Sequence, residues 1–401
     1  MNQIQILENS ILNYSWGSKR FISGLFGNTG SSDEPEAELW MGAHPKAPSY
    51  AVVKGSRLSL ADLIERDPKA VLGATVAERF SGKLPFLFKV LAAARPLSIQ
   101  AHPSMKQAGE GFAMEQAGKI PLDALNRNYR DDNHKPELLC ALTEMWALTG
   151  FRRVEEIIDL MGQINTACHG LGVDILRQNP GNVGLKMFFN YIMSMGKGEQ
   201  ARLVGDVMAV IEGLNNSDNT FDWMKKLNQE YPGDIGVISP LFLNVVLLKP
   251  GEALYIPAGE LHAYLDGAGI EIMANSDNVL RGGLTPKHVD PTELLKILSF
   301  VPDCPEILTP VDQDSMESVY LSEAKEFILS VIYLNKGKIY KSPAARNVEI
   351  IICTKGKADI RDLENGEPLE MTGGGSVLVP ASVREYQLEG EATLYKAGVP
   401  F

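Results

Sequence analysis

The hydrophobic residues follow different periods in different regions of the chain. In residues 84–103 and 136–142, apolar residues form nearly continuous runs, which are typical of buried β-strands. Short strand-like runs broken by Gly and Pro return from Pro240 onwards. Between these regions, four segments carry apolar residues at helical spacing: RRVEEIIDLMGQI, VGLKMFFNYIMSM, EQARLVGDVMAVIEGL and TFDWMKKLNQEY. The pattern predicts a mainly β protein with a helical insertion.

Helical spacing also occurs outside this insertion. Residues 58–80 should form one or two short helices, and residues 292–300 a further short helix. In residues 105–133 we expect a helix, then a second helix that starts near Pro121, and then a polar loop.

A weak internal repeat links two parts of the β region. A Gly stands six residues before a Pro–Ala pair at 251–258, and the same pattern occurs at 374–381. His262 lies five residues beyond the first Pro, whereas Glu385 occupies that position in the second copy. The second copy therefore has the turn residues without the histidine.

These patterns predict three domains. Residues 1–150 and 236–320 should form a jelly-roll barrel that carries the active site, and residues 151–235 a helical domain inserted into it. Residues 321–401 should form a second jelly-roll barrel, which has no metal.

Composition narrows the possible partners. The 401 residues are 45% hydrophobic and 22% charged, with a formal charge of −12, which argues against a nucleic-acid surface but allows a small phosphorylated ligand. The four cysteines (Cys140, Cys168, Cys304 and Cys353) form no C-x-x-C motif. With neither a signal-peptide pattern nor an apolar run of membrane-spanning length, we expect a cytoplasmic monomer without a membrane partner.

Two pairs of residues have a spacing suited to a metal site. Gln100 and His102 lie two apart at the end of one strand-like run, and Lys135 and Glu137 lie two apart at the start of another. On a strand, residues i and i+2 point to the same face. With His262 as a further ligand, imidazole nitrogens, an amide oxygen and a carboxylate make a plausible site for a divalent metal such as zinc.

Several sequence blocks carry a resemblance to a known family. Residues 251–262 follow G-x5-P-x-G-x2-H, the second metal motif of cupin barrels, with Asp266 where Asn is common. In combination with the remaining blocks, the chain resembles the type I phosphomannose isomerases, which belong to the cupin superfamily. The blocks are NYSWGS, AELWMGAHP, LPFLFKVL, LSIQAHP, NHKPEL, HAYLDG and EIMANSDNVLRGGLTPK. Over the helical insertion and the C-terminal barrel, the resemblance is one of layout only.

The resemblance implies one zinc ion per chain, an active-site Arg281, cations for a sugar phosphate, and four metal ligands, which fall on Gln100, His102, Glu137 and His262. It also implies an aldose–ketose isomerase that moves a proton between C1 and C2 of mannose 6-phosphate and fructose 6-phosphate through an enediol. Zinc and Arg281 would stabilise the negative charge on oxygen.

Three residues are candidates for the proton transfer. A bound metal disfavours the ammonium form of Lys135, and a neutral lysine there could shuttle protons. Glu271 and Asp277 are carboxylate alternatives, and the sequence does not rank the three.

Other residues are expected to contact the substrate. Lys89 lies in an apolar run, where an unpaired ammonium is costly, so we expect it to bind phosphate together with Arg281 and Lys287. Ser98 supplies a hydroxyl for the phosphate, and Trp16 is expected in the core or the wall of the pocket.

Two other functions fit part of the pattern. A cupin oxygenase would use the histidines and the carboxylate to bind ferrous iron, although an amide ligand such as Gln100 is unusual there. A non-catalytic sugar-binding cupin is the third possibility, but Lys89 and Lys135 beside the metal argue against it.

Overall fold

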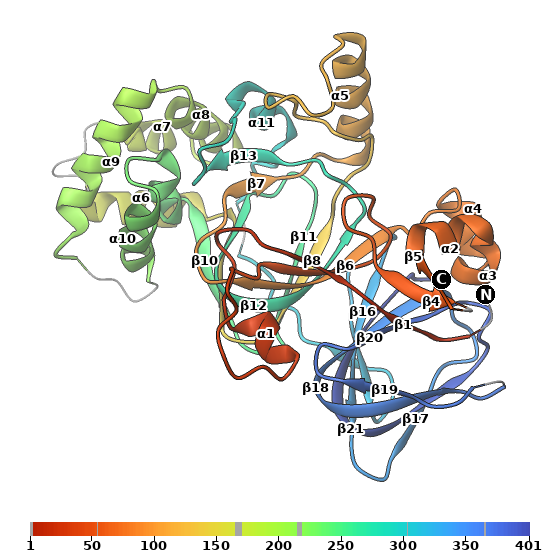
Figure 1. Cartoon of the computed structure of the whole chain (residues 1–401). Helices are drawn as coiled ribbons and strands as arrows, with labels where there is room; N and C mark the ends of the chain where they lie inside the picture. The colour runs from red at the N-terminus through yellow and green to blue at the C-terminus, as the bar shows by residue number, and fades with distance from the viewer. Residues whose placement is uncertain (1–2, 54, 165–170, 215–218, 303, 365) are drawn as a thin grey trace.

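The computed structural model describes residues 3–53, 55–164, 171–214, 219–302, 304–364 and 366–401, so Cys168 lies outside the described residues. Two large antiparallel sheets make up most of the molecule, and a group of helices lies against the end of the first sheet (Figure 1). The mainly β fold with inserted helices is thus confirmed. In the described residues, neither sheet closes into a continuous ring of paired strands.

The first sheet has ten strands, in the order β10-β9-β12-β6-β3-β2, with four shorter strands branching from this path. The long strand β12 pairs with β6, β7, β8 and β9, so it is the element that connects most of the sheet. The strands are β2 (Ser10–Leu12), β3 (Glu38–Met41), β6 (Phe86–Ala93), β7 (Ile99–Ala101), β8 (Glu137–Ala141), β9 (Met145–Phe151), β10 (Leu243–Leu248), β11 (Ala253–Ile256), β12 (His262–Ala274) and β13 (Leu280–Gly283).

The second sheet contains the C-terminal strands and one strand from the start of the chain. β1 pairs with β20, although residues 1–150 were expected to belong to the first barrel. The strands are β1 (Gln5–Leu7), β14 (Val311–Asp312), β15 (Glu317–Tyr320), β16 (Ile328–Leu334), β17 (Ile339–Lys341), β18 (Glu349–Asp362), β19 (Leu369–Thr372), β20 (Ser376–Val379) and β21 (Tyr386–Gly398). A separate hairpin is formed by β4 (Tyr50–Val53) and β5 (Ser56–Ser59).

The helices between β9 and β10 follow the four predicted segments, and the structure adds the short helix α7 and the 3-10 helix η1. Residues 58–80 form three short helices instead of one or two, because Asp67 and Gly73 each end one helix and cap the next. The helices are α1 (Phe21–Leu25), α2 (Leu60–Arg66), α3 (Pro68–Leu72), α4 (Ala74–Arg79), α5 (Met105–Ala117), α6 (Val154–Ile164), α7 (Val173–Gln178), α8 (Asn182–Met193), α9 (Lys197–Ile211), α10 (Thr220–Glu230), the 3-10 helix η1 (Ile235–Leu241) and α11 (Pro291–Ile297).

The second helix expected near Pro121 is wrong, because residues 120–130 form a loop held by side chains. The Arg127 guanidinium donates to the backbone carbonyls of Ile120 and Tyr129. The Glu115 carboxylate of α5 accepts hydrogen bonds from the backbone N–H groups of Asn128 and Tyr129. These bonds satisfy backbone groups without a helix.

The apolar run at 84–103 is not one strand but two, β6 and β7. The chain leaves the ladder at Arg95–Leu97, where Pro96 has no N–H to donate. The change of direction places β7 against β12 and β13, so that Gln100 reaches a different part of the sheet from β6.

Alternation along β6 gives the first sheet two distinct faces. Phe86, Phe88 and Val90 join a core that also contains residues of the second sheet, so this face packs between the two sheets. Leu87 and Lys89 point the other way and line a cavity. The period of two thus directs Phe86, Phe88 and Val90 towards the second sheet and the functional candidate Lys89 towards the cavity.

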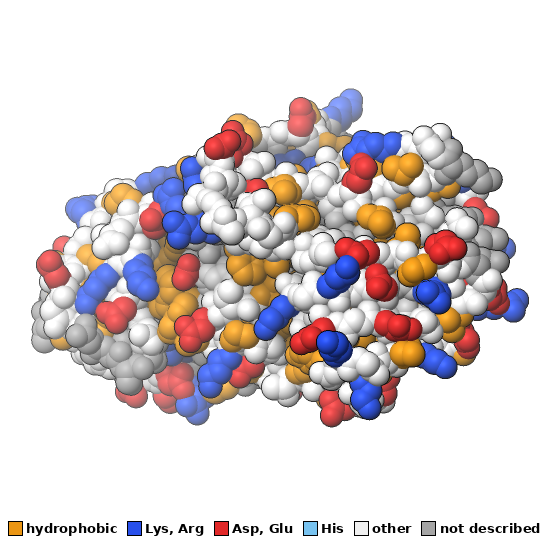
Figure 2. Space-filling model, turned by 60° about the horizontal axis from the view of Figure 1, so that its bottom comes forward, with side chains coloured by type: hydrophobic (Ala, Val, Ile, Leu, Met, Phe, Trp, Pro, Cys, Tyr) orange, Lys and Arg blue, Asp and Glu red, His pale blue; other side chains and the backbone are white. Residues whose placement is uncertain are grey.

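Within the described ranges, every helix is too short or too polar to cross a bilayer. Lys, Arg, Asp and Glu side chains are interspersed over the face drawn in Figure 2.

Candidate functional site

Two histidines converge on the carboxylate of Glu137, the first residue of β8. His102 follows β7 and His262 begins β12, and their Nε2 atoms lie 3.2 and 3.4 Å from the two Glu137 oxygens. The side chains of all three residues are at most 1% exposed. Their ligand atoms lie within 4.8 Å of one another.

Backbone carbonyls fix the orientation of both imidazole rings. His102 Nδ1 lies 2.6 Å from the Asn278 carbonyl, and His262 Nδ1 lies 3.1 Å from the Glu260 carbonyl. A carbonyl only accepts hydrogen bonds, so Nδ1 carries the hydrogen in each ring. A neutral ring with this tautomer presents the lone pair of Nε2 to Glu137.

The three side chains fit a bound cation. Neither Nε2 atom makes a hydrogen bond, and both face acceptor oxygens, which is unfavourable unless a proton or a metal lies between them. Burial and the nearby Lys135 ammonium lower the pKa of His102 to about 4, so a proton is not retained there at neutral pH. Imidazole nitrogens with a carboxylate are ligands that zinc prefers.

Gln100 lies on the same face as these histidines. Its position in β7 is directly opposite His262 of β12 on one side and Arg281 of β13 on the other. Residues directly opposite in antiparallel strands project to the same face. Gln100 and Arg281 both line the cavity, so the fourth predicted ligand is positioned beside the His–Glu–His group.

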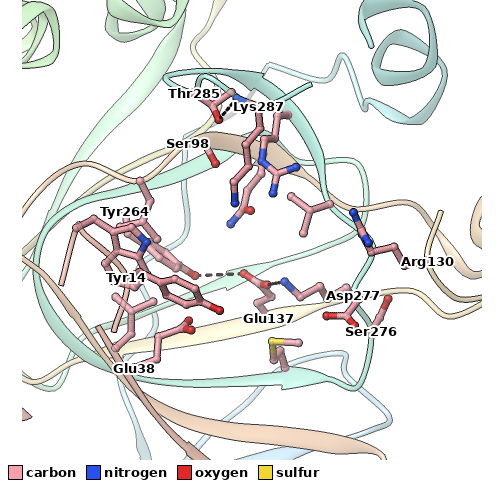
Figure 3. A pocket seen from close by; sticks show the side chains of 18 of the residues that line it. Tyr14, Glu38, Ser98, Arg130, Glu137, Tyr264, Ser276, Asp277, Thr285 and Lys287 are labelled. Atoms are coloured by element: carbon pink, nitrogen blue, oxygen red, sulfur yellow. Dashed lines mark hydrogen bonds and ion pairs between the residues drawn. The ribbon is translucent and has the colours of Figure 1, made fainter. Parts of the chain in front are cut away.

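The cavity beside this group has a volume of about 640 Å³. Figure 3 shows Glu137 near its centre, with Tyr14 and Glu38 on one side and Arg130, Ser276 and Asp277 on the other. The Tyr264 hydroxyl donates to Glu137 at 3.4 Å. The Lys135 ammonium lies 2.8 Å from the same carboxylate. Burial would raise the pKa of Glu137, but Lys135 and His102 outweigh it and hold this pKa well below its usual range.

Lys89 is paired with acidic residues instead of being free for an anion. Its ammonium lies 2.8 Å from Glu271 and 3.3 Å from Glu38, and all three side chains are buried. Burial would lower the pKa of Lys89, but the two carboxylates outweigh it and raise the pKa. This pairing leaves Lys89 little capacity to neutralise a phosphate, contrary to the expectation from the sequence.

A second group of cations lacks such partners. Among the described residues, no carboxylate pairs with Arg281, Lys287 or Arg130, which all line the cavity. Burial and the neighbouring Arg130 lower the pKa of Arg281. Burial, then Arg281 and Arg130, lower the pKa of Lys287. Mutually repelling cations around a cavity favour the binding of an anion.

Asp277 is the most accessible of the predicted carboxylates. It lies 2.7 Å from the Lys46 ammonium and 3.7 Å from His44 Nε2, and its side chain is 30% exposed. Burial would raise the pKa of Asp277, but Lys46 outweighs it and lowers the pKa. Burial raises the pKa of Glu271, in spite of the ion pair with Lys89.

The remaining predicted contacts also line the cavity. Ser98 lines the same cavity as Thr285 and Lys287 (Figure 3). Trp16 stacks on Tyr14, with ring centroids 5.7 Å apart.

The sequence did not identify several cavity residues. Glu38 lies two residues before Trp40 in β3, a spacing that could have marked it as sharing a face with that tryptophan. Arg130 lies in the loop at residues 120–130, part of which was expected to be a helix, and a loop has no periodicity that shows where a side chain points. Lys46 reaches the cavity from another loop.

Comparisons of sequence agree with this geometry. Residues 4–154 match the family model for the catalytic domain of type I phosphomannose isomerase. The mannose-6-phosphate isomerase of Salmonella typhimurium is 41% identical over 98% of both chains, and that of Escherichia coli 39% identical over 98% of both. The human mannose-6-phosphate isomerase is 32% identical over 94% of this chain and 93% of its own length.

Solved structures show the same similarity. A substituted form of phosphomannose isomerase from Salmonella typhimurium superposes with a TM-score of 0.92 and 38% identity, over 99% of this chain and all of the other. A zinc-bound mannose 6-phosphate isomerase superposes with a TM-score of 0.91 and 38% identity, over the same shares.

Proposed function

The chain belongs to the family of type I phosphomannose isomerases, and from this premise we propose that it interconverts D-mannose 6-phosphate and D-fructose 6-phosphate. The reaction opens the sugar ring and moves a proton between C1 and C2 through an enediol. Its active site must therefore bind a phosphate, carry a proton and stabilise negative charge on oxygen.

One zinc ion would be held by Gln100, His102, Glu137 and His262. When bound, it would polarise the oxygen atoms at C1 and C2 of the sugar. The buried, unpartnered Nε2 atoms of the two histidines support this assignment, because they face Glu137 oxygens without a hydrogen bond. This is the observation that carries the proposal.

Asp277 is the carboxylate best suited to remove the C2 proton. Its lowered pKa keeps it ionised at neutral pH, and it lines the cavity with part of its side chain exposed. Glu271 is less suited, because it is buried and joined to Lys89. Lys135 also lines the cavity and can return a proton or protonate the ring oxygen.

The phosphate is best accommodated by Arg281, Lys287 and Arg130, with Ser98 as an additional donor. These cations have no acidic partner in the described structure, so they can neutralise a dianion without breaking an ion pair. Arg281 lies opposite Gln100 across β7 and β13, which also lets it approach the oxygens of the sugar. We assign Lys89 the separate role of neutralising Glu38 and Glu271.

The test is a coupled assay of fructose 6-phosphate formation from mannose 6-phosphate, with zinc content measured on the same samples. The protein should hold about one zinc per chain, and a chelator should abolish activity until zinc is returned. His102→Ala and His262→Ala should each lose the metal and the activity, because the site has no spare ligand.

His288→Ala is the matched control, because this histidine is exposed and outside the metal group. It should keep the full zinc content. Undiminished isomerisation by a rigorously metal-free preparation would refute the metal assignment, and lack of turnover by the zinc-loaded protein would refute the proposed reaction.

A further inference from the structure

The turn after β13, residues 284–288, contributes to two cavities. Its residues 285–288 line the 640 Å³ cavity described above. The same residues also line a second cavity of about 580 Å³, whose opposite wall is formed by the helical insertion, including Met193, Lys197 and Gln200. These four residues, Lys287 among them, therefore form part of the wall of both cavities.

One carboxylate ties this turn to the rest of the protein. Asp234 Oδ1 accepts hydrogen bonds from the backbone N–H groups of Gly236 at 2.7 Å and Leu284 at 2.8 Å, and Oδ2 accepts from Thr285 at 3.3 Å. In the part of the chain that the structure describes, the bonds from Leu284 and Thr285 are the hydrogen bonds that join residues 284–288 to another segment. Thr285 in turn restrains the backbone of Lys287, because its hydroxyl accepts a hydrogen bond from the Lys287 N–H at 3.1 Å.

The backbone at the junction is strained and closely packed. Leu284 has a φ of 53°, in the left-handed region that a branched residue rarely adopts without support. A Cβ on Gly236 would lie 2.7 Å from the Leu284 nitrogen, and one on Gly283 would lie 2.9 Å from the Gly236 Cα. The two segments can therefore approach only with glycine at both positions, and this approach brings Asp234 within reach of the turn.

We propose that Asp234 is a positioning residue that holds the turn, and with it the cationic end of the cavity, in the conformation that binds the substrate phosphate. It sits at the end of the helical insertion, directly before η1, so the insertion contributes to phosphate recognition through this one side chain. The proposal rests on the proposed function, since it concerns the phosphate of that substrate. Asp234 is not within the metal group, so its effect falls on binding and not on the metal.

The experiment compares Asp234→Ala, Asp234→Asn and wild type in the zinc-loaded, full-length protein. The quantities measured are kcat and KM for mannose 6-phosphate, Ki for inorganic phosphate as a competitive inhibitor, and zinc content. Asp234→Ala should raise KM and Ki in parallel by about tenfold, the order expected when a charge-assisted contact is misplaced. Its kcat should stay within about threefold of wild type, and its zinc content should not change. Asp234→Asn retains one acceptor oxygen, so its KM and Ki should be intermediate.

Asp67→Ala is the matched control, because Asp67 caps α3 by accepting from the Ala70 N–H at 3.1 Å and lies outside both cavities. It should leave the phosphate Ki at the wild-type value. If Asp234→Ala does not fold, Asp234→Asn decides the question. A phosphate Ki equal to wild type in the folded Asp234 variants, even with a lowered melting temperature, would overturn the inference while the proposed function stands. A zinc-loaded wild type that does not isomerise mannose 6-phosphate would overturn both.

Discussion

Replacing Lys89 by methionine tests whether this buried ammonium neutralises carboxylates or binds the substrate. Lys89→Met keeps a long, flexible side chain but removes the charge that lies 2.8 Å from Glu271 and 3.3 Å from Glu38. The two carboxylates would then remain buried with no cation between them. Removing one partner of a buried ion pair is strongly destabilising, because it leaves uncompensated charge in a medium of low polarity.

The expected loss follows from the burial of this group. The side chains of Lys89, Glu38 and Glu271 are 7%, 9% and 4% exposed, so solvent screens their interaction only weakly. The free energy of unfolding should fall by about 3–5 kcal/mol. With a urea dependence of about 3 kcal/mol per molar or more for a chain of this size, the unfolding midpoint should fall by about 1 M.

Urea unfolding followed by circular dichroism, at a fixed zinc concentration, measures this shift. Lys106→Met is the matched control, because Lys106 is 83% exposed and lies 3.9 Å from Glu110. Its loss should change the free energy of unfolding by less than about 0.5 kcal/mol. If Lys89→Met instead keeps the wild-type midpoint and raises KM for mannose 6-phosphate more than about tenfold, Lys89 binds phosphate and our interpretation of its ion pairs is wrong.

Three further predictions concern the reaction. Arg281→Lys should lower kcat by about 100-fold in steady-state assays, because one ammonium cannot replace a planar fork of donors; near-normal turnover would contradict this role. The pKa of Lys287 is lowered, so its ammonium loses the proton at a lower pH than that of an ordinary lysine, and KM should rise towards alkaline pH. Lys287→Arg should remove that rise, because arginine stays protonated. Turnover in deuterated water should place deuterium on C1 of fructose 6-phosphate, as measured by NMR. Asp277→Asn should slow this exchange. Complete absence of label at equilibrium would indicate a hydride shift.

The metal group could be predicted from the sequence because local spacing identified its candidate residues and the family resemblance joined them into one set. Side chains alternate along a strand, so Gln100 and His102 could be recognised as neighbours on one face. The apolar run after Glu137 likewise showed that this residue begins a strand. The role of His262 came from a motif with defined turn residues. All three residues of the His–Glu–His group are where this reasoning put them.

The partners of Lys89 could not be predicted, because they depend on the pairing register of distant strands. Glu271 is opposite Lys89 across β12 and β6, and Glu38 comes from β3, on the other side of β6. The sequence shows only that a buried lysine needs compensation, not whether a carboxylate or a ligand provides it. For the same reason Arg130 was missed, since its position depends on the loop that Arg127 and Glu115 hold.

The arrangement of charge in the cavity, more than the number of cations, determines how a sugar phosphate can bind. Lys89 and Lys135 are each paired with a carboxylate within 2.8 Å, so neither ammonium is free to neutralise the phosphate. Arg281 and Lys287 repel each other without an acidic partner in the described residues, so a dianion relieves an existing cost when it binds between them. In the function that we propose, the phosphate therefore binds at the turn held by Asp234, and C1 and C2 of the sugar lie towards Glu137. A net charge of −12 is compatible with this site, because the acidic residues that face the cavity are already paired with cations where the phosphate does not bind.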